Sequence, residues 1–292
     1  MKDQTWLTTT AGIRMPRILY GTAWKKERTA ELVVQALEAG FRGFDTACQP
    51  KHYDERLVGE GLARARMLGI TRDELYLQTK FTPLSSQDPE QVPYDVDAPV
   101  DAQVAESFAV SQRNLQTDYV DCLILHSPMV PHETMMRAWQ AMEAIYAAGG
   151  ARQLGISNCY DPAVLKALHA AATVKPAVLQ NRFYKDNGFD VEQRTWCAEH
   201  GLIYESFWSL TANAKLLVSP LVQDLAQRYG RTEAQVFFRY LSLIGIVPLT
   251  GTSSEQHMRE DLDVFTFALS VEEMQDMDAL LAQAVIETAE ES

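Results

Sequence analysis

The sequence predicts an α/β fold, a single (β/α)8 TIM barrel that takes residues 1–292 as one domain. Short apolar runs alternate with amphipathic helices eight times, and no break in composition divides the 292 residues. No glycine-rich fingerprint follows the first strand, which argues against a doubly wound sheet. The nearest match, residues 59–64, follows a helix start and has an arginine where a small residue belongs, so it is read as ordinary helix.

The elements follow from the spacing of apolar residues and from the residues that punctuate them. Gly40 is expected to stop the first helix, and Asp101, Thr232 and Ser270 are expected to cap later ones. The expected helices include residues 29–39, 55–67, 191–200 and 221–229. The eight expected strands span residues 17–20, 43–45, 75–79, 119–125, 152–156, 177–180, 202–205 and 244–249.

Residues 83–99 interrupt this alternation. The segment is rich in Pro, Asp and Ser, which favours a loop. Long loops in compact domains are often functional, so we expect this one to lie near the mouth of the barrel.

The composition excludes several classes of partner. The net charge of −13 repels nucleic acid and anionic membranes, so neither is expected as a partner. The first residues lack the apolar core of a signal peptide, and no stretch is long enough to span a bilayer, which predicts a cytoplasmic protein. The four cysteines are far apart and form no C-x-x-C pair, so we expect reduced thiols and no metal site.

Four polar residues fall where a barrel places its catalytic groups, at the carboxyl ends of strands. Asp45, Lys80 and His126 end the second, third and fourth strands, and Tyr53 follows in the loop after the second. An inward lysine needs a partner, and Asp45 is the obvious one. A cation beside a phenol is expected to lower the pKa of Tyr53 from about 10. The set suits a reaction that places negative charge on an oxygen, such as carbonyl reduction.

These residues lie in segments that resemble the aldo-keto reductases. The matching segments are GFRGFDTA, HYDERLVG, RNLQTDYVDCLILH and GISN, and the resemblance covers nearly the whole chain. It implies a barrel that binds NADPH or NADH across its carboxyl-terminal mouth and reduces an aldehyde or ketone. It also implies the tetrad of Asp45, Tyr53, Lys80 and His126, with Tyr53 as the general acid and His126 positioning the carbonyl.

The sequence departs from the family pattern in the loop that carries the acid. The segment between Asp45 and Glu55 is two residues longer than the common pattern. Pro50 stands where a count forward from Asp45 puts the tyrosine, and His52 where a count back from Glu55 puts it. We take Tyr53 as the acid, which requires the loop to bulge, and keep His52 as the alternative.

The same resemblance implies the residues that hold the cofactor. Ser157, Asn158 and Gln180 are expected to bind the nicotinamide amide, and Trp208 to stack on the ring. Ser209, Leu210 and Thr211 are expected at the pyrophosphate. The segment on the adenosine side comprises Leu249, Thr250, Gly251 and Thr252, with His257 near the position of the family's arginine. Because Leu249 stands where the family has a lysine, we expect a weak preference for NADPH or none.

The expected substrate is a small carbonyl compound of apolar or aromatic character, because Trp24 and Phe81 are expected in its pocket. Two other functions remain open. One is a regulatory or redox-sensing subunit that binds the cofactor with little turnover. The other is a metal-dependent hydrolase using His126 and His132, although the sequence offers no third convergent ligand.

Overall fold

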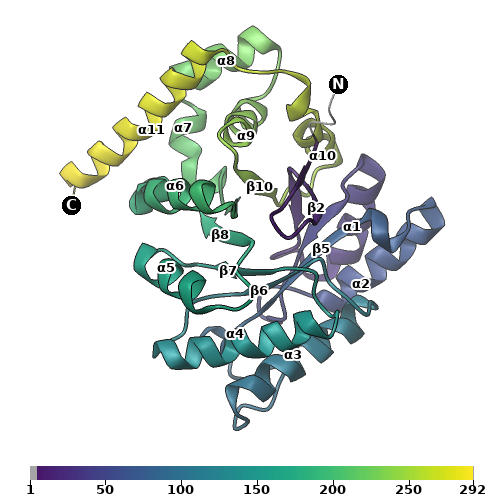
Figure 1. Ribbon diagram of the computed structural model, residues 1–292. Helices are drawn as coiled ribbons and strands as arrows, with labels where there is room; N and C mark the ends of the chain where they lie inside the picture. Colours follow the sequence, from purple (N-terminus) through teal and green to yellow (C-terminus); the bar gives the residue numbers. More distant parts are fainter. Residues whose placement is uncertain (1–4, 292) are drawn as a thin grey trace.

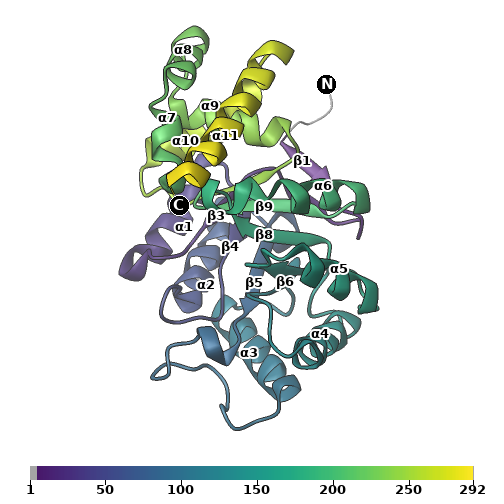
Figure 2. The same cartoon turned by 90° about the vertical axis from the view of Figure 1, so that its left-hand side faces the viewer.

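The computed structural model describes residues 5–291, in which eight parallel strands close a barrel (Figures 1 and 2). The strand order is β10-β3-β4-β5-β6-β7-β8-β9, which confirms the expected (β/α)8 fold. The single domain expected over residues 1–292 includes residues 1–4 and 292, which lie outside the described residues. The barrel strands are β3 (Leu19–Gly21), β4 (Gly43–Asp45), β5 (Tyr76–Phe81), β6 (Cys122–Leu125), β7 (Leu154–Ser157), β8 (Val178–Arg182), β9 (Ile203–Phe207) and β10 (Val247–Thr250).

Helices cover the outside of the barrel (Figure 1). The α-helices are α1 (Thr29–Ala39), α2 (Glu55–Ala63), α3 (Val100–Leu115), α4 (His132–Ala147), α5 (Pro162–Ala171), α6 (Val191–His200), α7 (Ala214–Leu217), α8 (Pro220–Tyr229), α9 (Glu233–Leu243), α10 (Glu255–Leu262) and α11 (Val271–Glu291). Short 3-10 helices span Lys26–Arg28, Arg64–Leu68, Arg72–Glu74, Leu84–Ser86, Lys185–Asp190, Thr211–Asn213 and Asp263–Thr266. No helix among the described residues is long and apolar enough to cross a membrane.

Most of the expected helix ends are confirmed. Gly40 ends α1 with a φ of 117°, and Thr232 forms the capping box of α9. Ser270 accepts from Glu273 N at 3.2 Å, as expected of a cap. The cap expected at Asp101 is wrong: Pro99 precedes α3, and Asp101 instead accepts a hydrogen bond from Arg137 at 2.7 Å.

The glycine pair in α2 serves packing. A Cβ built on Gly59 would lie 2.0 Å from the carbonyl oxygen of Asn114, and one on Gly61 would lie 2.7 Å from Cβ of Val33. Real Cβ atoms do not approach so closely, so these glycines let α1 and α3 pack closely against α2. The expectation that this segment is ordinary helix is confirmed.

The amino-terminal hairpin was not expected from the sequence. Strands β1 (Trp6–Thr8) and β2 (Arg14–Pro16) pair antiparallel, and Met15 of β2 is fully buried. Met15 joins an apolar cluster with side chains of the barrel strands, among them Leu19 and Tyr76. This cluster fills one part of the interior, and buried polar side chains occupy the part nearer the carboxyl ends of the strands.

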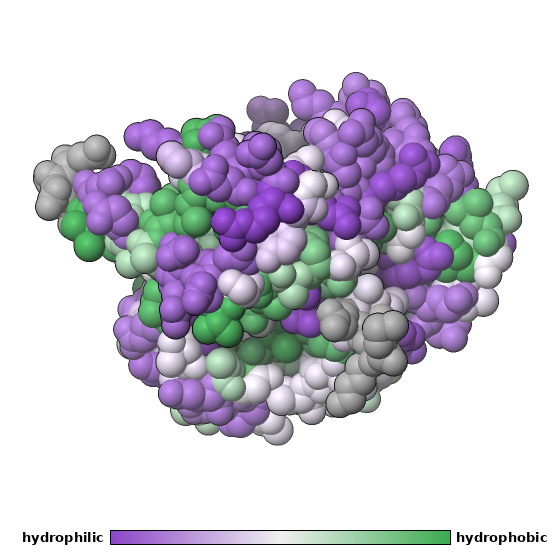
Figure 3. Space-filling view, turned by 90° about the horizontal axis from the view of Figure 1, so that it is seen from above, coloured by the Kyte–Doolittle hydropathy of each residue, from purple (hydrophilic) through white to green (hydrophobic). Residues whose placement is uncertain are grey.

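Residues 83–99 form the expected loop, with only the short helix Leu84–Ser86 inside it. Tyr94 links the loop to the end of β5, where its hydroxyl donates a hydrogen bond to the carbonyl of Thr82 at 2.8 Å. Figure 3 shows one face of the molecule, on which hydrophilic residues are widespread and apolar residues gather in the recessed part.

Candidate active site

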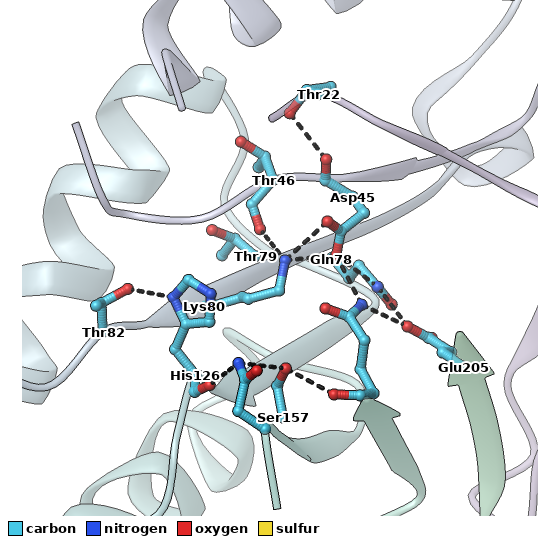
Figure 4. Close-up of polar contacts among 12 residues, drawn as sticks. Thr22, Asp45, Thr46, Gln78, Thr79, Lys80, Thr82, His126, Ser157 and Glu205 are labelled. Carbon is cyan, nitrogen blue, oxygen red and sulfur yellow. Dashed lines mark hydrogen bonds and ion pairs between the residues drawn. The ribbon is translucent and has the colours of Figure 1, made fainter. Parts of the chain in front are cut away.

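A buried ion pair lies at the centre of the polar interior (Figure 4). Nζ of Lys80, on β5, lies 2.6 and 2.8 Å from the two carboxylate oxygens of Asp45 at the end of β4, and it donates to the carbonyl of Thr46. Burial lowers the pKa of Lys80, but the charge and hydrogen bond of Asp45, together with Tyr53 and Glu205, outweigh it, and the net pKa is raised. The lysine therefore stays cationic, and the expected pairing with Asp45 is confirmed.

Tyr53 lies beside this pair, just before α2. The lengthened loop turns back on itself, so that Tyr53 N donates to the carbonyl of Gln49 at 3.0 Å. Asp54 caps α2 through Leu57 N and fixes where the helix begins. Nζ of Lys80 consequently lies 5.1 Å from the centroid of the Tyr53 ring.

The pKa of Tyr53 differs from the sequence expectation. Burial raises it, and the negative charge of Asp45 adds to that effect. Lys80 lowers it but does not outweigh burial, so the net pKa lies above the usual value of 10. The expected lowering is therefore wrong in sign. A phenol with a raised pKa keeps its proton at neutral pH, which suits a proton donor.

His52, the alternative acid, also borders the cavity that Tyr53 lines, but its ring lies against Trp24. Its ring lies 4.1 Å from the ring of Trp24, and its Nδ1 lies 2.9 Å from Oε1 of Gln49. The rings of Tyr53 and His126 are 6.1 Å apart, whereas His52 has no such contact with His126 or Lys80 among the described residues. The geometry thus favours Tyr53 over His52 as the neighbour of the ion pair.

His126 follows β6 and is held as a neutral ring. Its Nδ1 lies 2.6 Å from the hydroxyl of Thr82. Burial, and then the positive charge of Lys80, lower its pKa well below 6.5. With Nδ1 engaged, Nε2 is the ring nitrogen left for a substrate, because none of the described side chains hydrogen-bonds to it.

A cavity of about 1290 Å³ brings the expected residues together. Asp45, Tyr53 and His126 line it, and Lys80 lies behind them. Trp24 also lines the cavity, with 63% of its surface exposed. All the cofactor-binding residues that the resemblance implies are on its walls: Ser157, Asn158, Gln180, Trp208, Ser209, Leu210, Thr211, Leu249, Thr250, Gly251, Thr252 and His257.

Phe81 is the exception, and its expected place in the substrate pocket is wrong. Successive residues of a strand point to opposite faces, so Phe81 points away from the interior that holds Lys80. It is 1% exposed and packs 5.7 Å from the ring of Tyr94 in the outer core.

The residues expected at the nicotinamide are joined by hydrogen bonds. The Ser157 hydroxyl donates to the Gln180 carbonyl at 2.7 Å. The Asn158 amide donates to the His126 carbonyl at 2.9 Å and to Oγ of Ser157 at 3.2 Å. These contacts tie the ends of β6, β7 and β8 into one wall.

At the other end of the cavity the hydroxyl of Thr250 is already used. It donates to Oδ2 of Asp261 at 2.7 Å, and burial raises the pKa of Asp261 to about 7. Glu233 and Glu260 also line this end. Carboxylates therefore surround the place where the resemblance puts the adenosine.

Four cavity or interior residues were missed by the sequence analysis. Phe207, directly before Trp208, lines the cavity. The guanidinium of Arg182 lies 4.0 Å from the Trp208 ring, and its buried Nε has no hydrogen-bond partner in the described structure. Lys25 donates to the carbonyl of Gly251, and Glu205 lies inside the barrel. For Arg182 the period of two in a strand was the available signal, because Arg182 follows Gln180 by two. Lys25 lies outside the strands, where this signal does not apply.

The placement of His, Cys, Asp and Glu side chains among the described residues bears on the hydrolase alternative. Within residues 5–291 no three His, Cys, Asp or Glu side chains are grouped to hold an ion, so the hydrolase with His126 and His132 still lacks a third ligand. The four cysteines are buried and are not joined by a disulfide in the described structure.

Comparison with known proteins gives a consistent result. Residues 14–202 match the model of the Aldo/keto reductase family. A glyoxal reductase from Bacillus subtilis is 29% identical over 272 residues, which cover 92% of this chain and 90% of that protein. An aldo/keto reductase from Brucella melitensis has a TM-score of 0.79 at 25% identity, covering 94% of this chain and 98% of the other. The Bombyx mori aldo-keto reductase in complex with NADP shares the fold, with a TM-score of 0.78 at 23% identity over 94% of this chain and 92% of the other. The chain belongs to the aldo/keto reductase family.

Proposed function

We propose that the protein reduces a small aldehyde or ketone to an alcohol, using NADPH or NADH, with Tyr53 as the general acid. The observation that carries the proposal is the cluster of Tyr53, the Lys80–Asp45 pair and neutral His126 on one cavity wall. The names of relatives, such as the glyoxal reductase, agree with a carbonyl substrate.

The cavity residues fit a nicotinamide dinucleotide. The volume of about 1290 Å³ exceeds that of a pocket for one small ligand, which is roughly 300–1,000 Å³. Phe207 and Trp208 offer aromatic faces, and Lys25 and Arg182 are cations without a carboxylate partner among the described residues. An acidic protein that keeps two such cations in one cavity is suited to an anionic ligand such as a pyrophosphate.

Each residue then has a defined task. His126 donates a hydrogen bond from Nε2 to the carbonyl oxygen and fixes its position. Bound cofactor supplies the hydride that reaches the carbonyl carbon. Tyr53 transfers its phenolic proton to the oxygen, and Lys80 stabilises the phenolate that remains until water reprotonates it. Asp45 holds Lys80 in place.

We also propose that the cofactor preference is weak or absent. Leu249 brings no charge to a 2′-phosphate, and the hydroxyl of Thr250 donates to Asp261 instead of facing a ligand. Glu233 and Glu260 oppose a dianion at the same end. For the substrate, exposed Trp24 at the cavity favours an apolar or aromatic carbonyl.

The test is oxidation of NADPH and NADH with a panel of small aldehydes, including glyoxal and benzaldehyde, together with measured dissociation constants. Turnover with any of them supports the reductase. Tight cofactor binding without turnover across the panel would instead establish the regulatory or redox-sensing alternative, and no binding of either cofactor would exclude both.

A further inference from the structure

Glu205 is a second carboxylate in the barrel interior, fully buried on β9 (Figure 4). Its Oε2 accepts from the side-chain amide of Gln78 at 2.8 Å and from that of Gln180 at 2.7 Å. The same two nitrogens donate to Oδ1 of Asp45, at 2.7 and 3.0 Å. Two amides thus bridge two carboxylates.

This arrangement fixes which way each amide faces. An amide nitrogen carries two hydrogens, and a carboxylate accepts only. Both hydrogens of Gln78 and both of Gln180 are therefore used by Asp45 and Glu205. The remaining atom of each amide is its oxygen, which can only accept.

The two glutamines differ in where that oxygen points. Oε1 of Gln78 accepts from the hydroxyl of Tyr76 at 3.2 Å inside the barrel. Oε1 of Gln180 accepts from no residue between 5 and 291, and Gln180 lines the cavity. Oε1 of Gln180 is consequently a free acceptor at the cavity, and the nitrogen of the same amide has no hydrogen left to donate there.

We propose that Glu205 is a positioning residue that, together with Asp45, holds the Gln180 amide with its oxygen toward the cofactor, where it accepts an N–H of the nicotinamide carboxamide. This inference rests on the proposed function. It predicts selection for a carboxamide over a carboxylate on the pyridine ring, because two acceptors repel each other and leave a buried group unpaired.

Protonation of Glu205 weakens this selection, because Oε2 then accepts from the Gln180 amide without the charge that strengthens the hydrogen bond. Burial, and then the charge of Asp45, raise its pKa to about 7, and its Oε1 is buried without a partner in the described interior and is free to take the proton. The groups that face it are Asp45, Lys80, Tyr76 and Cys122. The pKa values of the last three are raised, so none of them titrates between pH 6 and about 8.

The experiment compares binding of NAD⁺ and of nicotinic acid adenine dinucleotide, which carries a carboxylate in place of the carboxamide, by tryptophan fluorescence. At about pH 8 the wild type should bind NAD⁺ at least about tenfold more tightly. In Glu205→Met no acceptor remains at this position, so the Gln180 amide is free to turn its nitrogen to the cavity, and the ratio should fall to about threefold or less. Thermal unfolding of each variant confirms that it is folded.

Asp190→Asn is the matched control. Asp190 is also a buried carboxyl with an unpartnered oxygen in the described structure, and burial raises its pKa to about 6, but it bonds Asn181 and Tyr204 away from the cavity. This variant should keep the wild-type ratio. The wild type alone provides a second test. Its preference for NAD⁺ over nicotinic acid adenine dinucleotide should be smaller at about pH 6 than at about pH 8.

Equal binding of the two dinucleotides by the wild type would overturn the inference while leaving the reductase intact. So would an unchanged ratio in folded Glu205→Met, or a wild-type ratio that does not respond to pH. If neither dinucleotide nor NADPH binds, the proposed function itself fails, and this inference fails with it.

Discussion

Lys80 and Asp45 form an ion pair whose side chains are 0% and 3% exposed, with 2.6 Å between Nζ and Oδ1. Breaking a buried pair leaves one charge uncompensated, which costs about 3–5 kcal/mol. Lys80→Met should therefore lower the free energy of unfolding by about that amount, because Asp45 would keep only amide donors and face Glu205. Urea denaturation measures it. The double variant Lys80→Met/Asp45→Leu should recover part of the loss, and no recovery would contradict this account.

Replacing Tyr53 tests the acid. Tyr53→Phe keeps the ring but removes the proton, so kcat should fall by about 10²–10⁴-fold. The dissociation constant of the cofactor should hardly change, since the hydroxyl is not expected to bind it. His52→Ala is the matched control and should retain most of the turnover. The reverse pattern, an active Tyr53→Phe and an inactive His52→Ala, would show that the loop register is wrong.

Cofactor preference is tested at Leu249. Leu249→Lys should tighten NADPH binding by about one to two decades, because a charged hydrogen bond contributes about 1.5–3 kcal/mol. NADH binding should stay nearly unchanged. Leu243→Lys, at an apolar residue outside the cavity, is the control for added charge. A wild type that binds NADPH about a thousandfold more tightly than NADH would refute the assignment of this segment.

The pH dependence of reduction follows from Tyr53 and His126. The pKa of Tyr53 is raised, so the acid form persists beyond the usual value of 10, and the pKa of His126 is well below 6.5, so its ring is neutral throughout. The kcat for carbonyl reduction should therefore be flat between about pH 7 and about pH 9. Stopped-flow turnover at saturating substrate checks this. A fall in kcat with a midpoint near about pH 8 would mean that Tyr53 loses its proton far more easily.

Glu205 should make the protein less stable as pH rises. Its folded pKa of about 7 lies above the unfolded value of 4.5, so the folded state holds the proton more tightly. The contribution of Glu205 to the free energy of unfolding is therefore complete below about pH 4.5. It falls by about 3 kcal/mol as the pH rises to about 7, because each unit of pKa shift corresponds to about 1.36 kcal/mol. Urea denaturation at about pH 5 and about pH 8 should show a flatter dependence in Glu205→Gln. Parallel curves for variant and wild type would exclude this.

Much of the site could be predicted because a parallel barrel collects the carboxyl ends of its strands. A position at the end of an apolar run was enough to place Asp45, Lys80 and His126 on one side of the molecule. The position of Tyr53 was harder, since the lengthened loop allows two registers by counting. The hydrogen bond from Tyr53 N to Gln49 decides how that loop turns.

The sequence by itself determined the (β/α)8 barrel and placed Asp45, Lys80 and His126 at strand ends, because apolar periodicity and strand ends are local properties of the chain. The cofactor-binding residues around the cavity came from the resemblance to the aldo-keto reductases. The outward orientation of Phe81 was available from the sequence, because Lys80 was expected to point inward and successive residues of a strand point to opposite faces. The tertiary structure alone decided that Phe81 packs against Tyr94, which lies in the loop of residues 83–99. It also decided the raised pKa of Tyr53, because burial is a sum over elements distant in sequence. The bonds of Thr250 to Asp261 and of Glu205 to Gln180 join residues 11 and 25 positions apart, and only folding brings them within reach.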